Sequence, residues 1–289
     1  MRQQGQVALL SHIQYPKVLN HLPSWVPDYS RPVSDPLQIP QDDHMSLDPK
    51  FFASRNTTQG PDIVVRRQGL TTWSLTLDGY IYDRVCRTGR FPNRVSNNEV
   101  PLHETFTWPR DWLHEILRLS YRTSAEFSTF GARLHAVTRT SVGGAAHVNE
   151  VNLARVGDAF FNQAAFLIGR RISNIEHTRA KAEFRRFLAG SDMKGKFKDM
   201  NPISLPLVRN IIGRSLERLP FVTHKGHLGL GRDNICEGDF IAIFHGAEVP
   251  HILREQKPGV YELVCEAYVD GIMDGEALQG LDSTRITLV

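Results

Sequence analysis

Three carboxylates crowd a short stretch near the C-terminal end of the sequence. Asp270, Asp274 and Glu276 lie within seven residues, with Gly271 and Gly275 between them. Paired carboxylates can perform acid–base catalysis when their surroundings separate their pKa values. Closely spaced glycines, however, are typical of a solvated turn. The preferred interpretation is a turn followed by the start of a helix, and an enzyme site near these carboxylates remains the alternative.

Histidines and cysteines gather in the same part of the chain, where they could ligate a metal. They are His224, His227, Cys236, His245, His251 and Cys265. Structural zinc sites normally show closely spaced ligand pairs, and these spacings match no such pattern. We therefore interpret the histidines as turn residues and the cysteines as core thiols, and we predict no metal site.

Three further motifs come close to known sites and fail at one position. Residues 190–197 nearly spell a phosphate-binding loop, but Phe197 stands where that loop needs a hydroxyl for magnesium. The glycines from Gly226 onward lack the spacing of a dinucleotide-binding turn. His114 and Glu115 would begin a zinc-protease helix, but Arg118 replaces the second histidine. We assign no catalytic, cofactor-binding or metal-binding residue, and we predict a protein that is not an enzyme and has no cofactor.

Residues 170–198 carry nine Lys or Arg residues against three acidic ones. Such a stretch could attract nucleic acid or an anionic membrane. The candidates for that alternative are Arg170, Arg171, Arg179, Arg185, Arg186 and Lys196. Interleaved exposed aromatics, which a single-strand binder needs, are missing, because Phe184 and Phe187 take core positions of a predicted helix. A solvated helix face is the preferred interpretation.

Composition places the chain among ordinary globular proteins. Of its 289 residues 41% are hydrophobic and 22% are charged, and the formal net charge is +3. Cys86, Cys236 and Cys265 are too few and too scattered for a disulfide framework. No apolar run is long enough for a signal peptide or a membrane span. We expect a cytoplasmic protein without a transmembrane segment, whose partner is another protein, and we find no firm nucleic-acid signal.

The elements that must position these residues indicate an α+β fold in three successive parts. Residues 1–104 are expected to hold a proline-rich extended segment and a small antiparallel sheet. Residues 105–219 are expected to be helical, and residues 220–289 to form a small barrel-like β module. Within the first part, residues 22–29 include Trp25 and Tyr29, which predict an extended segment pinned to a neighbouring core by its aromatic side chains.

The spacing of apolar residues, which differs between strands and helices, predicts where the individual strands and helices lie. Strands are predicted at 62–66, 70–77 and 80–85, and Asp78-Gly79 between the last two predicts a hairpin turn. Helices are predicted to begin near residues 107, 124, 149, 173 and 202, the last of them ending near 219. Glycine-punctuated strands follow at 221–223, 239–244, 249–254 and 260–269. Alternating apolar residues predict that the last of these is half-buried.

The C-terminal strands also carry a family resemblance. The blocks 221–231, 237–242, 246–254 and 261–276 together resemble the C-terminal region of fungal heterokaryon incompatibility proteins, which contain a HET domain. Residues 22–29, with the sequence LPSWVPDY, resemble the segment that follows the HET domain in the same proteins. The resemblance implies a role in non-self recognition at hyphal fusion and in the programmed cell death that follows.

Two blocks of the HET domain itself, an "ALSYVWG"-like strand and a "WIDALCINQ"-like stretch, do not occur in the sequence. We therefore expect a truncated protein in which most or all of the HET domain is missing, and no catalytic residue carries over. The matching blocks consist of turn glycines and alternating apolar residues, a pattern typical of a scaffold or binding surface. The sequence thus predicts a non-catalytic recognition or regulatory portion of a heterokaryon incompatibility protein.

Overall fold

The computed structural model describes residues 5–13, 17–30, 36–37, 51–55, 57, 63–68, 72–90, 104–122, 127–147, 153–170, 172–175 and 177–289. The chain forms two compact units. The barrel-like unit comprises Met1–Asp42, Lys50–Cys86 and Gly231–Val289, and the helical unit comprises Asp43–Pro49 and Arg87–Leu230. The barrel-like unit thus combines segments from the N-terminal and the C-terminal parts of the chain. The predicted α+β class, with a helical middle and a barrel-like C-terminal region, is confirmed.

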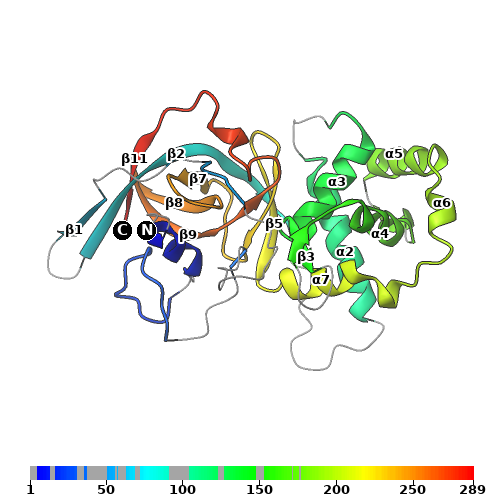
Figure 1. Cartoon of the computed structure of the whole chain (residues 1–289), viewed down its shortest axis with the longest axis horizontal. Helices are drawn as coiled ribbons and strands as arrows, with labels where there is room; N and C mark the ends of the chain where they lie inside the picture. The colour runs from blue at the N-terminus through cyan, green and yellow to red at the C-terminus, as the bar shows by residue number, and fades with distance from the viewer. Residues whose placement is uncertain are drawn as a thin grey trace. The chain divides into compact units, whose positions relative to one another are not determined.

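A curved sheet forms the barrel-like unit, and Figure 1 shows β2 arching over β7 and β8. Its strands are β1 (Val64–Gln68), β2 (Thr72–Thr88), β7 (Phe240–Phe244), β8 (His251–Lys257), β9 (Val260–Glu266), β10 (Tyr268–Val269) and β11 (Thr284–Leu288). β2 pairs antiparallel with β1, with β11 and with β7. β8 pairs antiparallel with β7 and with β9, and β9 pairs in parallel with β11. The path of pairings therefore returns to β2.

β2 is one continuous strand, so the predicted hairpin turn at Asp78-Gly79 is wrong. Gly79 is paired on both sides, with Thr284 of β11 and with Phe244 of β7. A Cβ atom at this position would lie 2.8 Å from the carbonyl oxygen of Ile243. Glycine is needed here because two neighbouring backbones approach closely, not because the chain must turn.

The apolar core of the barrel-like unit is built from several strands and the first helical turns. Its strand residues are Leu75, Leu77, Phe240, Ala242, Phe244, Leu253, Tyr261, Leu263, Ile286 and Leu288. α1 (Gly5–Ala8) and η1 (Leu9–His12) add Val7 and Leu10. The predicted half-buried alternation fails in β9, where every residue from Leu263 to Glu266 is buried. Continuous burial requires cover on both faces of the sheet.

Residues 17–30 are fastened to this sheet by hydrogen bonds as well as by an aromatic side chain. The N–H of Ser24 donates to the carbonyl of Val289 at 2.9 Å, and its hydroxyl accepts from the N–H of Leu263 at 2.9 Å. Trp25 packs against the core cluster, whereas Tyr29 is 66% exposed. One aromatic side chain therefore anchors the segment, together with a main-chain contact that its sequence does not reveal.

Asp28 closes the same segment into a loop. Its carboxylate accepts hydrogen bonds from the hydroxyl and N–H of Ser30 and from the N–H groups of Leu19 and Val18. These bonds, the Ser30 hydroxyl foremost, hold the pKa of the Asp28 carboxyl well below its usual range. An ionised Asp28 thus fixes the turn that presents Ser24 and Trp25 to the sheet.

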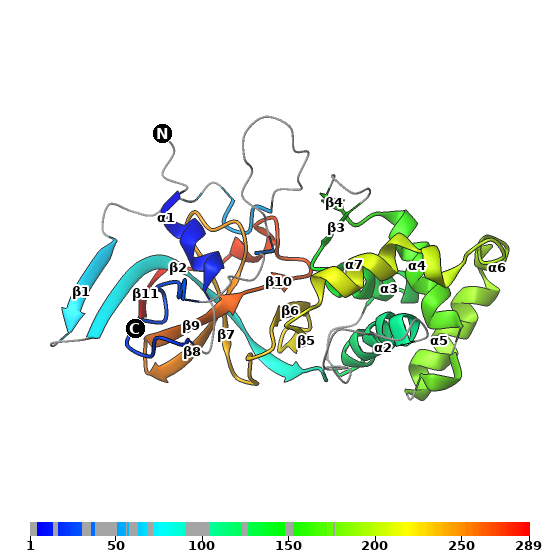
Figure 2. The ribbon, with the colours of Figure 1, turned by 90° about the horizontal axis from the view of Figure 1, so that it is seen from below.

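The helical unit packs five main helices, which Figure 2 shows gathered together. They are α2 (Glu104–Leu119), α3 (Phe130–Ser141), α4 (Asp158–Gly169), α5 (Thr178–Ala189) and α7 (Pro206–Arg214), with short turns η2 (Ile172–Asn174), α6 (Met193–Lys196) and η3 (Pro202–Ser204). β3 (Ala145–His147) pairs with β4 (Leu153–Arg155), and β5 (Arg218–Thr223) with β6 (Leu228–Arg232). Trp112 is fully buried, and its Nε1–H donates to the carbonyl of Ser141 at 3.0 Å.

Four of the predicted helices are shorter than expected. The helices predicted from residues 124 and 173 begin at Phe130 and Thr178, and two others give way in part to strands. The helix predicted from residue 149 begins at Asp158, because Leu153–Arg155 forms strand β4 instead. The helix predicted from Pro202 to about 219 is interrupted: α7 ends at Arg214, and β5 begins at Arg218. In both places the apolar spacing suits a strand equally well, and the partner strand decides the outcome.

Candidate functional site

Two of the three C-terminal carboxylates accept hydrogen bonds within their own turn. Asp270 accepts a hydrogen bond of 2.6 Å from the hydroxyl of Tyr268, and Glu276 accepts one of 2.8 Å from the N–H of Asp274. Gly275 has a φ of 82°, as a turn requires. Asp274 and Glu276 are exposed. This arrangement favours the turn over the alternative of an enzyme site.

The candidate metal ligands are scattered in the structure. The described residues contain no group of three or more His, Cys, Asp or Glu side chains placed to hold a metal ion. Cys236 is exposed, and Cys265 is buried with its Sγ accepting from the N–H of Arg232 at 3.4 Å. His245 lies on a turn, where it contacts Ser283 at 3.0 Å. His251, by contrast, lies fully inside the barrel-like unit.

His251 is a buried imidazole, and neither ring nitrogen has a hydrogen bond of standard geometry in the described part of the chain. Its ring lies 5.3 Å from that of Phe244, and its partner across the strands is Glu266, which is also buried. Burial lowers the pKa of His251 to about 4, and a backbone group of Val249 opposes this only in part. The residue is therefore neutral at physiological pH.

This burial predicts acid sensitivity. The unfolded chain binds a proton at His251 below about pH 6.5, whereas the folded chain binds it only near pH 4. Stability should fall through that window by about 3 kcal/mol in total. Urea unfolding at pH 7, 6, 5 and 4.5 should show a shallower loss for His251→Leu than for the unchanged chain. His224→Leu, at an exposed turn, is the matched control, and equal slopes for all three proteins would contradict the prediction.

The basic stretch is partly neutralised by its own neighbours. Arg179 bonds to Glu183 at 2.7 Å, and Lys196 lies 3.3 Å from Asp192. Arg170 lies over the ring of Phe166, and Arg185 and Arg186 are exposed. Arg171 is outside the described residues. The near-miss phosphate loop at 190–197 follows α5 and contains α6, so it lacks the strand that such a loop requires.

The paired ends of β1 and β2 carry apolar residues that the chain leaves exposed. Val65 pairs with Leu75, and Arg67 pairs with Trp73. Opposite residues of an antiparallel pair lie on one face of the sheet. On this face Leu75 belongs to the core, but Val65 is 50% exposed and Trp73 is 42% exposed. This side of the β1–β2 pair is therefore buried at Leu75 and exposed to solvent at Val65 and Trp73. We call Val65, Arg67 and Trp73 the hairpin face.

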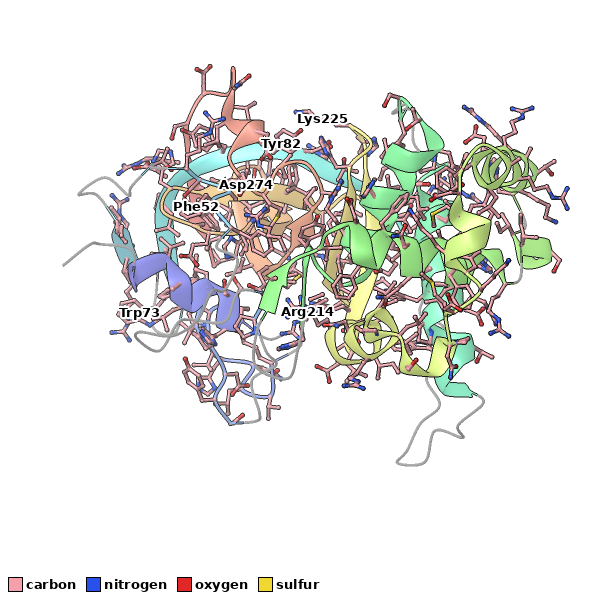
Figure 3. The ribbon with its side chains drawn as sticks, turned by 45° about the vertical axis from the view of Figure 1, so that its right-hand side comes forward. Phe52, Trp73, Tyr82, Arg214, Lys225 and Asp274 are labelled. Carbon is pink, nitrogen blue, oxygen red and sulfur yellow. The ribbon has the colours of Figure 1, made fainter. Side chains whose placement is uncertain are left out.

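The hairpin face also carries positive charge. The guanidinium of Arg67 lies 5.8 Å from the centre of the Trp73 ring. Figures 1 and 2 show β1 and the start of β2 projecting as a ribbon beyond β11. Figure 3 shows Trp73 on this ribbon, apart from Phe52 and Asp274. Tryptophan and arginine are the residues that most often dominate binding energy at protein interfaces.

A cavity in the helical unit is lined by the residues of the incomplete zinc-protease motif. His114, Glu115 and Arg118 of α2 line it, together with His177 before α5. Burial lowers the pKa of His114, whose ring nitrogen lies 3.4 Å from the carbonyl of Ile168. The residues of the incomplete protease motif therefore form part of a cavity wall, although Arg118 replaces the second histidine that a zinc ion would need. Helical spacing alone would have placed His114 and Arg118 on one face.

The comparisons with known proteins agree with this fold. Residues 207–286 match the Het-6 beta-barrel domain, a range that contains β7, β8 and β9. Heterokaryon incompatibility protein 6, OR allele, of Neurospora crassa is 44% identical over 61 residues, which are 20% of this chain and 9% of that relative. No solved structure matches the chain.

The predicted resemblance of the C-terminal region to fungal heterokaryon incompatibility proteins is therefore confirmed. It supports a role related to heterokaryon incompatibility. The matching segment is a small share of the relative's length, and β2 lies outside the matched range although it pairs with two barrel strands. Within the described residues, no helix has the length and apolar character needed to cross a bilayer.

Proposed function

We propose that this chain is a non-catalytic recognition portion of a heterokaryon incompatibility protein. It acts in the cytoplasm in non-self recognition and regulates the programmed cell death that follows hyphal fusion. Its partner is another protein. The hairpin face carries the proposal, because Val65 and Trp73 stand exposed on a face that belongs to the core at Leu75.

The chemistry of the hairpin face defines the partner that it fits. Two apolar side chains offer anchors that lose water on contact. Arg67 beside them favours an acidic segment. β1 is an edge strand, since its described pairing is with β2 alone. An acidic partner segment can therefore add along this ribbon and set its apolar side chains against Trp73.

The proposal predicts that Trp73→Ser removes the incompatibility response while the fold persists. The variant is expressed in a fungus whose incompatibility reaction depends on this gene, and growth and cell death are scored in forced heterokaryons. Loss of an interface tryptophan weakens binding by about 2–4 kcal/mol, so death should fall to near the background of compatible pairs. Thermal unfolding of the purified variant verifies that the fold is kept.

Phe52→Ser is the matched control. Phe52 is 46% exposed, close to the 42% of Trp73, and belongs to the same unit outside the hairpin face. This variant should keep the full response. An unchanged response in Trp73→Ser, or equal loss in both variants, would refute docking through the hairpin face. Substrate turnover by the purified chain that one substitution abolishes would refute the non-catalytic role.

A further inference from the structure

The cavity of the helical unit has the size of a small-molecule site and a mostly polar lining. Its volume is about 520 Å³, within the range of about 300–1,000 Å³ typical of ligand pockets. Leu117, Ile175 and Ala180 supply an apolar part of the wall. These three residues are buried, and the charged residues lie beside them. Such a division suits a ligand with one apolar and one charged end.

The acidic groups of the wall are already matched by arginines. Glu115 receives two bonds from Arg118, at 2.7 and 2.5 Å, and one of 2.6 Å from the N–H of Arg90. Burial alone would raise the pKa of Glu115, but these bonds outweigh it and the pKa lies below its ordinary value. Asp111 bonds to Arg110 at 2.9 Å. Both carboxylates are therefore paired with an arginine.

The guanidinium of Arg90 supplies the positive charge in excess of these pairs. It lines the cavity, while its backbone N–H holds Glu115. Arg110, which does not line the cavity, pairs with Asp111, and Arg118 pairs with Glu115, so these two pairs leave the guanidinium of Arg90 for a ligand although the lining arginines and carboxylates are equal in number. An arginine fork binds the oxygens of phosphate particularly well, through two parallel hydrogen bonds.

His177 adds a ring N–H donor to the same wall. Its Nδ1 accepts from the N–H of Ala180 at 3.4 Å, so the ring N–H available to a ligand is that of Nε2. The ring stacks on that of Tyr121 with centres 4.6 Å apart, and the Tyr121 hydroxyl donates to Glu183 at 2.6 Å. These contacts fix the ring orientation before any ligand arrives.

We propose that this cavity binds a small organic phosphomonoester. Arg90 and the Nε2–H of His177 hold the phosphate, and the organic part lies against Leu117 and Ile175. This inference is independent of the hairpin face, which belongs to the other unit. It adds a ligand site to a protein proposed above to act through protein contacts.

Calorimetric titration of the purified chain tests the proposal, with inorganic phosphate and phenyl phosphate as probes. Phenyl phosphate should bind saturably and at least tenfold more tightly than phosphate, because its ring enters the apolar part. Arg90→Gln should weaken phenyl phosphate binding at least tenfold, and Arg90→Lys should restore part of it. Arg209→Gln is the control, since Arg209 is an exposed arginine on α7 that does not line the cavity.

Each adverse outcome is distinct. Absence of saturable binding of either probe below about 10 mM overturns the proposal. Equal affinity for the two probes overturns the organic phosphomonoester assignment, because the apolar wall then plays no part. Equal weakening by Arg90→Gln and Arg209→Gln overturns the site, because general surface charge then attracts the probe. Arg90 is exposed, and thermal unfolding of Arg90→Gln verifies that the fold is intact.

Discussion

Replacing Gly79 with alanine should destabilise the barrel-like unit by about 2–3 kcal/mol, a large effect for a single added methyl group. The new Cβ would lie 2.8 Å from the carbonyl oxygen of Ile243 and 3.1 Å from the Cα of Phe244. Both atoms belong to the backbone of β7, and β11 pairs on the other edge of β2. Since neither strand can yield without losing hydrogen bonds, the strain stays in the sheet.

The measurement is the unfolding midpoint, combined with hydrogen exchange of the β7 amides. The midpoint should fall by about 5–10 °C, and exchange should accelerate in β7. Gly213→Ala on α7 is the control, because nothing lies within 4 Å of the position that its methyl group would take and alanine favours a helix by up to about 1 kcal/mol. Normal stability and exchange in Gly79→Ala would show that β7 does not pack against β2 at this residue.

Removing the carboxylate of Asp239 should destabilise the same unit by about 3 kcal/mol. Asp239 is buried at the start of β7, and its two oxygens accept from Nε and Nη2 of Arg254 at 2.9 and 2.8 Å. It also accepts from the N–H of Cys236 at 2.8 Å. Asp239→Ala removes both carboxylate oxygens from a largely buried guanidinium, whose Nη2 still donates to the carbonyl of Asn234 at 2.9 Å, and it removes the acceptor of the Cys236 N–H. Taking away one partner of such a pair costs more than the pair itself contributes.

A double-mutant cycle separates the ion pair from the other losses. Asp239→Ala combined with Arg254→Met should be more stable than Asp239→Ala alone, because the stranded charge is gone, and the coupling energy should exceed about 1 kcal/mol. Arg285→Ala is the comparison, since Arg285 and Asp78 are 3.8 Å apart with half of the arginine exposed. That change should lower stability by under about 1 kcal/mol. Strict additivity in the cycle would contradict the argument.

The C-terminal strands were largely predictable because their signals are local. Glycine turns and short apolar runs located β7, β8 and β9 to within three residues. The strand β11 was missed, although the alternation Thr284, Ile286, Leu288 carries the same signal. Asp78-Gly79 shows the opposite limit, because a glycine required for close strand packing looks the same in the sequence as one required for a turn.

The candidate site was less accessible to sequence reasoning than the fold. His114, Glu115 and Arg118 stood out as a motif, but the opposite wall at Ile175 and His177 comes from a later segment. Val65 and Trp73 are exposed because the β1–β2 pair extends past the residues that cover the core. The alternation of apolar residues in a strand does not tell how far that cover reaches. Contacts between residues of elements that are far apart in the chain cannot be predicted from a single sequence.

The order in which the strands are synthesised has a consequence for how this protein matures. β2 is made early, yet its partners β7 and β11 leave the ribosome after the whole helical unit. At about 5–20 residues per second, the roughly 200 residues from Gly79 to Thr284 take about 10–40 s. Until β7 and then β11 emerge, the part of β2 beyond Thr76 lacks these partners, so the nascent chain is a natural client for chaperones.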